Sequence, residues 1–259
     1  MSRIKRLLII GDTQAKPNLN LDYCKAIGRY IVDKKPDVIV HLGDGWDFPS
    51  LSSYDKHTKA SEGRRLVEDL AAGDESMREL LKPLWALQAR QKMNKKKLYS
   101  PRLVFTLGNH EDRLNRLFNQ NAELEGVVTT PKERLEDMGW EVSDFLVPVE
   151  IGGIYFAHYM ANPMTGKPYG GTALNIMKTI GRSFVMGHRQ TLDIAMRPTI
   201  NGSQEIGIIC GACYPQDEAY KGPQGNNHFR GVVMLHEVEN GFGLPMPVSL
   251  SYLMKHYLK

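Results

Sequence analysis

The chain has 259 residues, of which 42% are hydrophobic and 24% charged, and its formal net charge is +4. This composition is typical of a globular protein with a sizeable core, and 259 residues allow one large domain or two small ones. No apolar run approaches the roughly 18 residues of a membrane-spanning helix, which excludes a membrane span. The mild positive charge permits an anionic substrate without requiring nucleic acid.

The N-terminal segment and the cysteines bear on where the protein is located in the cell. Residues 1–6 are basic, but the apolar run after them stops at Ile10, which is too short for a signal peptide. We therefore expect a cytoplasmic protein without a membrane partner. Cys24, Cys210 and Cys213 form no disulfide framework, and a lone CxxC is a weak indication of zinc or redox chemistry. We expect three buried thiols.

The first 47 residues predict a βαβ unit. Residues 5–10 and 38–42 are short apolar runs of the kind that forms buried strands. The helical pattern between them has Asn18 or Asn20 as its candidate cap, and Pro36 ends it. Two strands joined in this way are parallel, and their crossover is right-handed.

A helical insertion is predicted over about residues 56–100. The apolar stripe that should pack on the core is Leu66, Val67, Leu70, Met77, Leu80, Leu81, Leu84 and Trp85. Gly73 and Asp74 predict a break into two helices, with Asp74 as the second cap. Residues 95–97 are three lysines, which form either a solvated helix end or a contact with a phosphate backbone.

The remaining chain alternates short strands with a few helices, and we see no linker that marks a second domain. Strands are expected at 103–107, 141–142, 145–151, 154–157, 182–186, 194–197, 206–210 and 231–238. Helices are expected at 114–118, at 131–138 and after a Thr172 cap to Ile180. The strand-rich part from about 191 to 259 is expected to complete a second sheet and add an extension.

Polar side chains follow five of the predicted strands. They are Asp12 and Gln14, Asp44, Asn109 and His110, His158, and His188 and Gln190. Open α/β sheets bind ligands at the carboxyl ends of their strands, so these groups should converge. Carboxylate, amide and imidazole ligands suit manganese, iron or zinc. An Asp that bridges two such ions is the usual device for phosphoester displacement.

In this order the motifs resemble those of the calcineurin-like metallophosphoesterases. They are Gly11-Asp12-Thr13-Gln14, Gly43-Asp44-Gly45-Trp46-Asp47, Gly108-Asn109-His110-Glu111, His158 and Gly187-His188-Arg189-Gln190, and the resemblance spans residues 9 to 190. It implies an α/β layered fold in which two mixed sheets form a β-sandwich flanked by helices, with the metal site at the strand C-terminal ends. It also implies one domain over residues 1–259.

A looser resemblance points to the phosphoesterases of tailed bacteriophages. It rests on the segment from Gly43 to Tyr54 and on the loop from Asn162 to Gly171. A phage-encoded enzyme would work in the host cytoplasm, and nucleic acid or nucleotides would be its natural substrates.

The family resemblance also implies a role for each motif residue. Asp44 would bridge two metals, while Asn109, His158 and His188 would complete one site. Asp12, Gln14 and Gln190 would form the other. His110 would be the catalytic general acid at the leaving oxygen, oriented by Asp47 or Glu111. Asn109, His110 and Arg113 would bind the substrate, although a plain surface salt bridge is an equal alternative for Arg113.

Two residues depart from the family pattern, because Gln14 and Gln190 stand where the family has histidines. A glutamine oxygen is a neutral, hard ligand and a poorer partner than imidazole for zinc or iron. We therefore expect one tight and one weakened site, with Mn²⁺ as the favoured ion and Mg²⁺, Ni²⁺, Zn²⁺ or iron as alternatives.

Three functions are compatible with these motifs. The favoured one is a phosphodiesterase or nuclease that acts on DNA, RNA or nucleotides by attack of a metal-bound hydroxide. It is favoured by a basic segment over residues 90–102 and by Arg113 and Arg116. The second is a phosphomonoesterase acting on phosphoprotein or nucleotide. The third is a degenerate, metal-poor binding module, against which the retained general acid His110 argues.

The other histidines are predicted to have no metal role. His41, His57, His236 and His256 are expected to be strand residues. His228 lies in the long polar loop 214–228, where contact with substrate or a neighbouring subunit is open.

Overall fold

The computed structural model describes residues 4–53, 58–218 and 221–258. The first sheet contains β1 (Ile4–Ile10), β2 (Val38–His41), β3 (Arg102–Thr106), β4 (Glu141–Ser143), β10 (Gly231–Glu239) and β11 (Phe242–Ser249). The second contains β5 (Val149–Ile151), β6 (Ile154–Ala157), β7 (Phe184–Met186), β8 (Leu192–Pro198) and β9 (Gln204–Cys210). The α-helices are α1 (Asp22–Lys34), α2 (Leu66–Met93), α3 (Asp112–Gln120), α4 (Pro131–Asp137), α5 (Ala173–Ile180), α6 (Gly222–Asn226) and α7 (Leu250–Tyr257).

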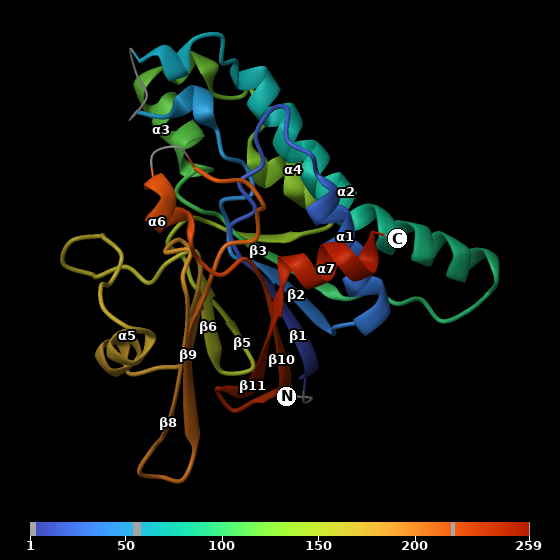
Figure 1. Ribbon diagram of the computed structural model, residues 1–259, viewed down its shortest axis with the longest axis vertical. Coiled ribbons are helices and arrows are strands. Elements are labelled where there is room, and N and C mark those ends of the chain that lie inside the picture. The colour runs from blue at the N-terminus through green and yellow to red at the C-terminus, as the bar shows by residue number, and fades with distance from the viewer. Residues whose placement is uncertain (1–3, 54–57, 219–220, 259) are drawn as a thin grey trace.

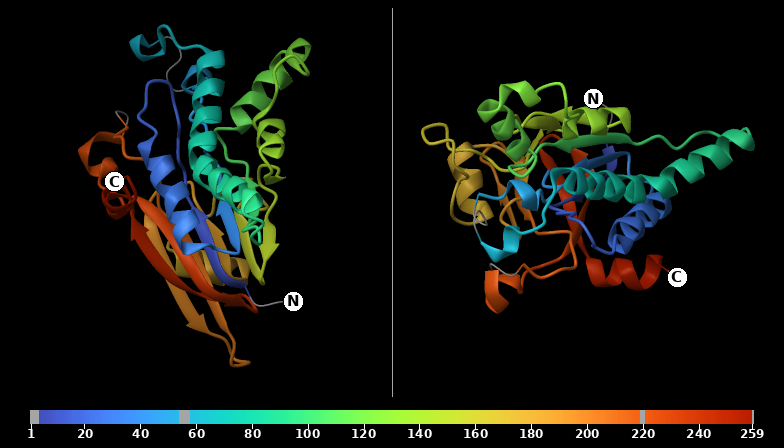
Figure 2. Two further views of the ribbon diagram at one scale, coloured as in Figure 1. Left: turned by 90° about the vertical axis from the view of Figure 1, so that its right-hand side faces the viewer. Right: turned by 90° about the horizontal axis from the view of Figure 1, so that it is seen from above.

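The two sheets pack face to face between helices, as Figures 1 and 2 show. Their strand orders are β11-β10-β1-β2-β3-β4 and β5-β6-β7-β9-β8. β1, β2, β3 and β4 are parallel to one another, whereas β10 is antiparallel to both of its neighbours, β1 and β11. The expected layered α/β sandwich of two mixed sheets is confirmed.

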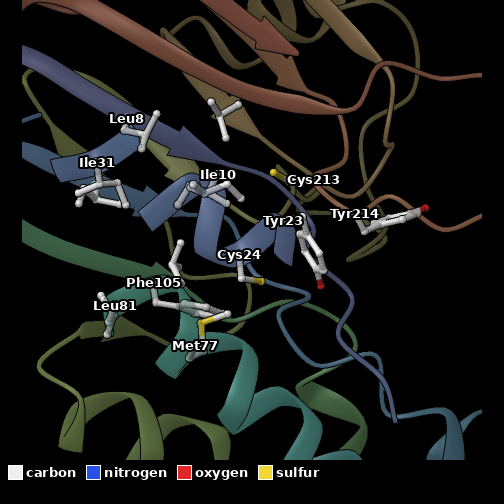
Figure 3. Close-up of a cluster of buried hydrophobic side chains, with 14 of the residues drawn as sticks. Leu8, Ile10, Tyr23, Cys24, Ile31, Met77, Leu81, Phe105, Cys213 and Tyr214 are labelled. Carbon is white, nitrogen blue, oxygen red and sulfur yellow. The ribbon is translucent and has the colours of Figure 1, made fainter. Parts of the chain in front are cut away.

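Alternation along β1 explains the layers. Leu7 and Ile9 face the second sheet, while Leu8 and Ile10 pack with α1 and α2, and all four are fully buried. Figure 3 shows Leu8 and Ile10 in this second cluster beside Ile31, Met77 and Leu81. A third cluster lies between the second sheet and α5. Both faces of the first sheet are therefore covered, and its polar groups gather at the strand ends.

The predicted break at Gly73 and Asp74 is wrong, because α2 runs unbroken through both residues. A Cβ at Gly73 would lie 1.8 Å from the Trp46 ring, so this glycine serves close packing and not a helix end. Asp74 pairs with Arg134 at 2.5 Å instead of capping a helix. Val67, placed on the core stripe, is 71% exposed. The expected start of the insertion, near residue 56, lies outside the described residues.

The C-terminal part divides between the two sheets, which corrects the expectation that it completes only the second. β8 and β9 join the second sheet, but β10 pairs with β1 and β11 extends the first. The strand expected over 145–151 is confined to β5. The predicted cap of α1 is wrong, because the N-cap residue is Leu21, without a side-chain cap bond, and not Asn18 or Asn20. Asn20 lies one residue earlier, and its Oδ1 accepts the backbone N–H of Asp22 at 2.8 Å.

The cysteines and histidines mostly follow expectation. Cys24, Cys210 and Cys213 are free, buried thiols, and burial raises the pKa of each above its usual range. His41 ends β2 and His236 lies in β10, whereas His256 belongs to α7 and not to a strand. His57 lies outside the described residues. None of the described helices combines the length and apolarity that a membrane crossing requires.

Candidate metal centre

Two turns meet at the carboxyl ends of β2 and β3, and their glycines permit the contact. A Cβ at Gly108 would lie 2.1 Å from Asp44 Oδ1. Gly43 has a φ of +88°, and a Cβ there would lie 2.5 Å from the carbonyl oxygen of Thr106. Side chains at these positions would push the turns apart, so both glycines are needed to bring Asp44 beside Asn109 and His110.

Glu111 fastens the same two turns together. It is 2% exposed, and its carboxylate accepts the backbone N–H groups of Asp44, Gly45, Trp46 and Gly108 at 2.7–3.1 Å. Burial raises the pKa of Glu111, and the Asp44 charge adds to that effect, while the backbone donors oppose it. The sequence suggested Glu111 only as a possible orienter of His110. Its position shows that it orders the backbone beneath the centre.

Four groups converge on one side of the centre. Asn109 Oδ1 lies 2.8 Å from both His158 Nε2 and His188 Nδ1, and these nitrogens are 3.2 Å apart. Asp44 Oδ2 lies 3.4 Å from His158 Nε2. The candidate ligand atoms of Asp44, His158 and His188 all lie within 4.8 Å of one another. We call these four residues the complete half.

The chemistry of the complete half fits a cation. His158 Nδ1 lies 2.7 Å from the carbonyl oxygen of Leu42, to which it donates, so Nε2 is the ring nitrogen left to bind an ion. Nε2 faces the Asn109 oxygen and the Asp44 carboxylate. Burial, reinforced by the charge of His158, lowers the pKa of His188 to about 4, which keeps this ring neutral. Converging acceptors without protons of their own are what a divalent ion requires.

The other half contains Asp12, Gln14 and Gln190, and we call it the glutamine half. Asp12 is fully buried, and its Oδ1 accepts the backbone N–H of His188 at 3.0 Å. Burial raises its pKa to about 6, against the opposing charge of His158 and with the help of Asp44. Gln190 Nε2 donates to Asp12 Oδ2 at 3.4 Å, while Gln190 Oε1 accepts from the hydroxyl of Tyr214 at 3.0 Å. Gln14 is 2% exposed, and its Oε1 has no hydrogen-bond partner.

Four of the candidate ligand residues have an unusual backbone conformation. Gln14, Asp44, His188 and Gln190 have φ angles of 41°, 50°, 62° and 60°, in the left-handed region that non-glycine residues rarely adopt. Such residues cost of order 1 kcal/mol each and cluster at functional sites. Both halves therefore rest on strained turns.

His110 sits at the mouth of the centre and is oriented by Asp47. Its Nδ1 lies 3.0 Å from Asp47 Oδ1, and its Nε2 lies 3.6 Å from Asp44 Oδ2. Burial lowers the pKa of His110, but the charge of Asp44 and the hydrogen bond to Asp47 outweigh it and raise the pKa to about 9. The choice between Asp47 and Glu111 that the sequence left open is thereby resolved in favour of Asp47.

Arg113 is tied to the protein backbone. Its Nη1 donates to the carbonyl oxygens of Asp47 and Phe48 at 2.8 and 3.2 Å. Its Nη2 lies 3.1 Å from His110 Nε2, and its charge opposes protonation of that ring. These contacts give Arg113 a role in placing His110, and its predicted contact with substrate stays a prediction.

A cavity of about 290 Å³ opens over both halves. Its lining is Gln14, Asp44, Asn109, His110, His188, Arg189, Gln190, Thr191, Lys221, Gly225 and His228. The long loop 214–228, for whose His228 a contact with substrate or a neighbouring subunit was left open, contributes Lys221, Gly225 and His228 to this wall. Nothing in the motif pattern signalled Lys221, because it follows no strand and belongs to no spaced set.

The basic segment 90–102 lies at the wrong end of the sheet to serve the cavity. Arg102 begins β3 and pairs with Glu141, which begins β4. Tyr99 donates to the carbonyl oxygen of Pro36, just before β2. The metal-ligand candidates stand at the opposite, carboxyl ends of these strands. The expectation that this segment forms a basic rim around the site is therefore wrong.

The layered sandwich and its cation site at the strand ends define a metal-dependent hydrolase of phosphoesters. The chain belongs to the calcineurin-like phosphoesterase family, whose model matches residues 5–203. It is therefore a hydrolase acting on phosphoester bonds, in a family that binds divalent metals.

Relatives occur in two mycobacteriophages. The Gene 54 protein of Mycobacterium phage L5 is 29% identical over 189 residues, covering 71% of this chain and 68% of that protein. The Gene 54 protein of Mycobacterium phage D29 is 27% identical over the same coverage. Among solved structures, a conserved protein of Streptococcus pneumoniae TIGR4, described as a predicted phosphoesterase, aligns over 96% of this chain and 99% of its own. Its TM-score is 0.32 and its identity 11%.

Proposed function

We propose that the protein is a metal-dependent phosphodiesterase or nuclease that acts on nucleic acid or nucleotides. The observation that carries the proposal is the convergence of Asp44, Asn109, His158 and His188 on one point beside His110. We propose that these four residues hold one ion tightly, and that Asp12, Gln14 and Gln190 hold a second one weakly. Manganese is the favoured metal, because the site mixes two imidazoles with carboxylate and amide oxygens.

Divalent ions bound there supply Lewis-acid charge at the phosphoryl oxygens and lower the pKa of an attacking water. The chain's own groups supply the rest. Asp47 holds Nδ1 of His110, so Nε2 is the nitrogen that faces the reacting group. Burial lowers the pKa of His110, but the Asp44 charge and the hydrogen bond to Asp47 raise it, which favours the protonated ring that would give its proton to the leaving oxygen. Glu111 keeps both turns in register during this step.

Two observations support a nucleic acid or nucleotide substrate. Lys221 and Arg189 put positive charge on the wall of the cavity, where a phosphate backbone would lie. The similarity to proteins of two mycobacteriophages supports a role in the host cytoplasm, where phage and host nucleic acids are processed.

Hydrolysis of bis-p-nitrophenyl phosphate by the purified protein tests the proposal. We expect turnover with manganese and loss of turnover after chelation. If a folded sample turns over neither this diester nor p-nitrophenyl phosphate with manganese, magnesium, nickel or cobalt, the enzyme proposal fails and the binding-module alternative takes its place.

The diester must be compared with p-nitrophenyl phosphate and with single-stranded DNA. We expect a higher kcat/KM for the diester than for the monoester, together with cleavage of the DNA. A preference for the monoester without DNA cleavage would instead identify a phosphomonoesterase.

A further inference from the structure

The loop that carries Lys221 is fastened to the glutamine half. Gln216 Nε2 donates to the backbone oxygen of Gln14 at 3.3 Å. Glu218 pairs with Lys16 at 2.9 Å, two residues after Gln14. Asn226 closes the loop on itself, because it accepts from the backbone N–H of Glu218 and donates to its carbonyl oxygen. The loop is thereby positioned beside the motif that departs from the family pattern.

Tyr214 connects this loop to the centre through a chain of hydrogen bonds. Its ring is fully buried at the edge of the apolar core, and Figure 3 shows its hydroxyl pointing away from the other labelled side chains. That hydroxyl accepts from Lys221 Nζ at 2.9 Å and donates to Gln190 Oε1 at 3.0 Å. Gln190 then donates to Asp12 Oδ2 at 3.4 Å. The ammonium and the buried carboxylate are thus the two ends of one polar chain.

The hydrogen-bonded chain from Lys221 to Asp12 bears on the charge balance of the buried centre. Asp12 and Asp44 are 0% and 2% exposed, so two carboxylates share one buried centre and require positive charge. An ion in the complete half serves Asp44, but the two side-chain amides of the other half are neutral. Burial lowers the pKa of Lys221, while the nearby Asp12 charge acts in the opposite sense and favours the ammonium. Arg189, the other long cation on the wall, is exposed and donates to the carbonyl oxygen of Gly171.

The residues of the cavity wall beside the glutamine half differ in whether they can bind a cation or an anionic oxygen. The unpaired Oε1 of Gln14 is an acceptor and cannot bind an anionic oxygen, so it suits a cation or a water. Gln190 has its oxygen occupied by Tyr214 and its nitrogen turned to Asp12. Of the described residues on this wall, Lys221 has the charge and the donors that a phosphoryl oxygen needs.

We propose that Lys221 binds a non-bridging phosphoryl oxygen of the substrate on the Asp12 side, and so supplies positive charge that a fully ligated second metal ion would otherwise provide. The inference rests on the proposed function of the site and adds a substrate-binding residue to it. Tyr214 is the positioning residue, since its hydroxyl holds the ammonium over the cavity.

Titration of inorganic phosphate into manganese-loaded protein, followed by calorimetry, tests the inference. A charge-assisted hydrogen bond that is lost weakens binding by about tenfold or more. We expect Lys221→Met to lose at least that factor, Tyr214→Phe to lose less, and Lys221→Arg to keep most of the affinity. Lys132→Met is the matched control, because Lys132 pairs with Asp144 on the surface and does not line the cavity.

Manganese stoichiometry and thermal denaturation accompany the titration, so that loss of metal or of folding is not mistaken for loss of phosphate. If Lys221→Met is unfolded, Tyr214→Phe and Lys221→Arg decide the question in samples that bind as much manganese as the wild type, because the Tyr214 hydroxyl also bonds Gln190. Phosphate affinity within twofold of wild type in all folded variants overturns the inference.

Kinetics separate this inference from the proposed function. We expect Lys221→Met to raise KM for the diester more than it lowers kcat. If the wild type hydrolyses no phosphoester while phosphate binding still depends on Lys221, the proposed function fails and the anion site stands. If the wild type is active and the variants bind phosphate normally, the proposed function stands and the inference about Lys221 fails.

Discussion

The two halves of the centre differ in the polar atoms that they leave available to a ligand. In the complete half, Asn109 Oδ1, His158 Nε2 and His188 Nδ1 lie 2.8–3.2 Å from one another, and the Asp44 carboxylate faces them. In the glutamine half, Gln190 already spends both ends of its amide on protein partners. One motif pattern can therefore leave converging ligand atoms on one side, while the amide of Gln190 on the other side is bonded within the protein.

Removing Asp44, the residue that we propose bridges the two halves, should have the largest effect. Asp44→Asn keeps the side-chain volume but removes the charge that faces His158 and His110. We expect kcat/KM for the diester to fall by roughly three orders of magnitude, since several kcal/mol of transition-state stabilisation depend on the metal. Asp144→Asn, on the surface, should leave kcat/KM unchanged. Equal activity of Asp44→Asn and wild type would remove Asp44 from the centre.

Loss of the carboxylate beneath both halves should act on stability. Glu111→Gln replaces one acceptor oxygen by an amide donor, which then faces backbone N–H groups that are themselves donors. We expect the free energy of unfolding to fall by about 3 kcal/mol. Urea denaturation measures the change. A loss below about 0.5 kcal/mol would show that the turns do not depend on this clamp.

If His110 is the general acid, the effect of losing it on kcat should depend on the leaving group. Asp47→Asn removes the carboxylate that holds His110, and we expect kcat to fall by about tenfold to a hundredfold for a diester with an alkyl leaving group. The loss should be smaller for p-nitrophenol, which leaves without a proton. Equal losses for the two substrates would contradict the role of His110 as a proton donor.

The pH profile gives an independent reading of His110. Its pKa is raised to about 9, so the protonated form is present below that pH and is lost as the pH rises through it. Activity should therefore decline on the alkaline side, and Asp47→Asn should move that decline to lower pH because it removes a cause of the raised pKa. An alkaline limb that is the same in both proteins would contradict this account.

The smallest kinetic change is expected from restoring the family pattern. Gln14→His with Gln190→His should tighten the weaker ion by more than about tenfold while kcat changes less than that, since Lys221 already supplies positive charge on this side. Metal analysis and steady-state kinetics of the double variant measure both quantities. Metal affinity equal to that of wild type would count against the interpretation of the two glutamines.

Much of the architecture could be predicted from the sequence, because β1, β2 and β3 are continuous apolar runs and each ends in Gly with polar residues behind it. What could not be predicted depends on partners distant in the chain. Gly73 looked like a helix break until Trp46 was found against it. The pairing of β10 with β1 leaves no local signal, since a register is set between strands and not within one.

The site shows the same division. Asp12, Asp44, Asn109, His158 and His188 follow strands and could be found by position alone. Glu111 was visible in its motif, but its four backbone donors are not a sequence property. Lys221 is in a loop whose position depends on Tyr214 and Gln216. The basic segment near residue 95 was wrongly predicted to lie near the site. A run of charged residues does not indicate which end of a sheet it lies at.

Calorimetric titration of manganese into metal-free wild-type protein tests the asymmetry of the two halves most directly. We predict one tight ion per chain, lost in His158→Ala. We predict a second ion that binds at least about tenfold more weakly, because two of its side-chain ligands, Gln14 and Gln190, are neutral amides. Two ions of equal affinity, or a tight ion that survives in folded His158→Ala, would contradict these predictions.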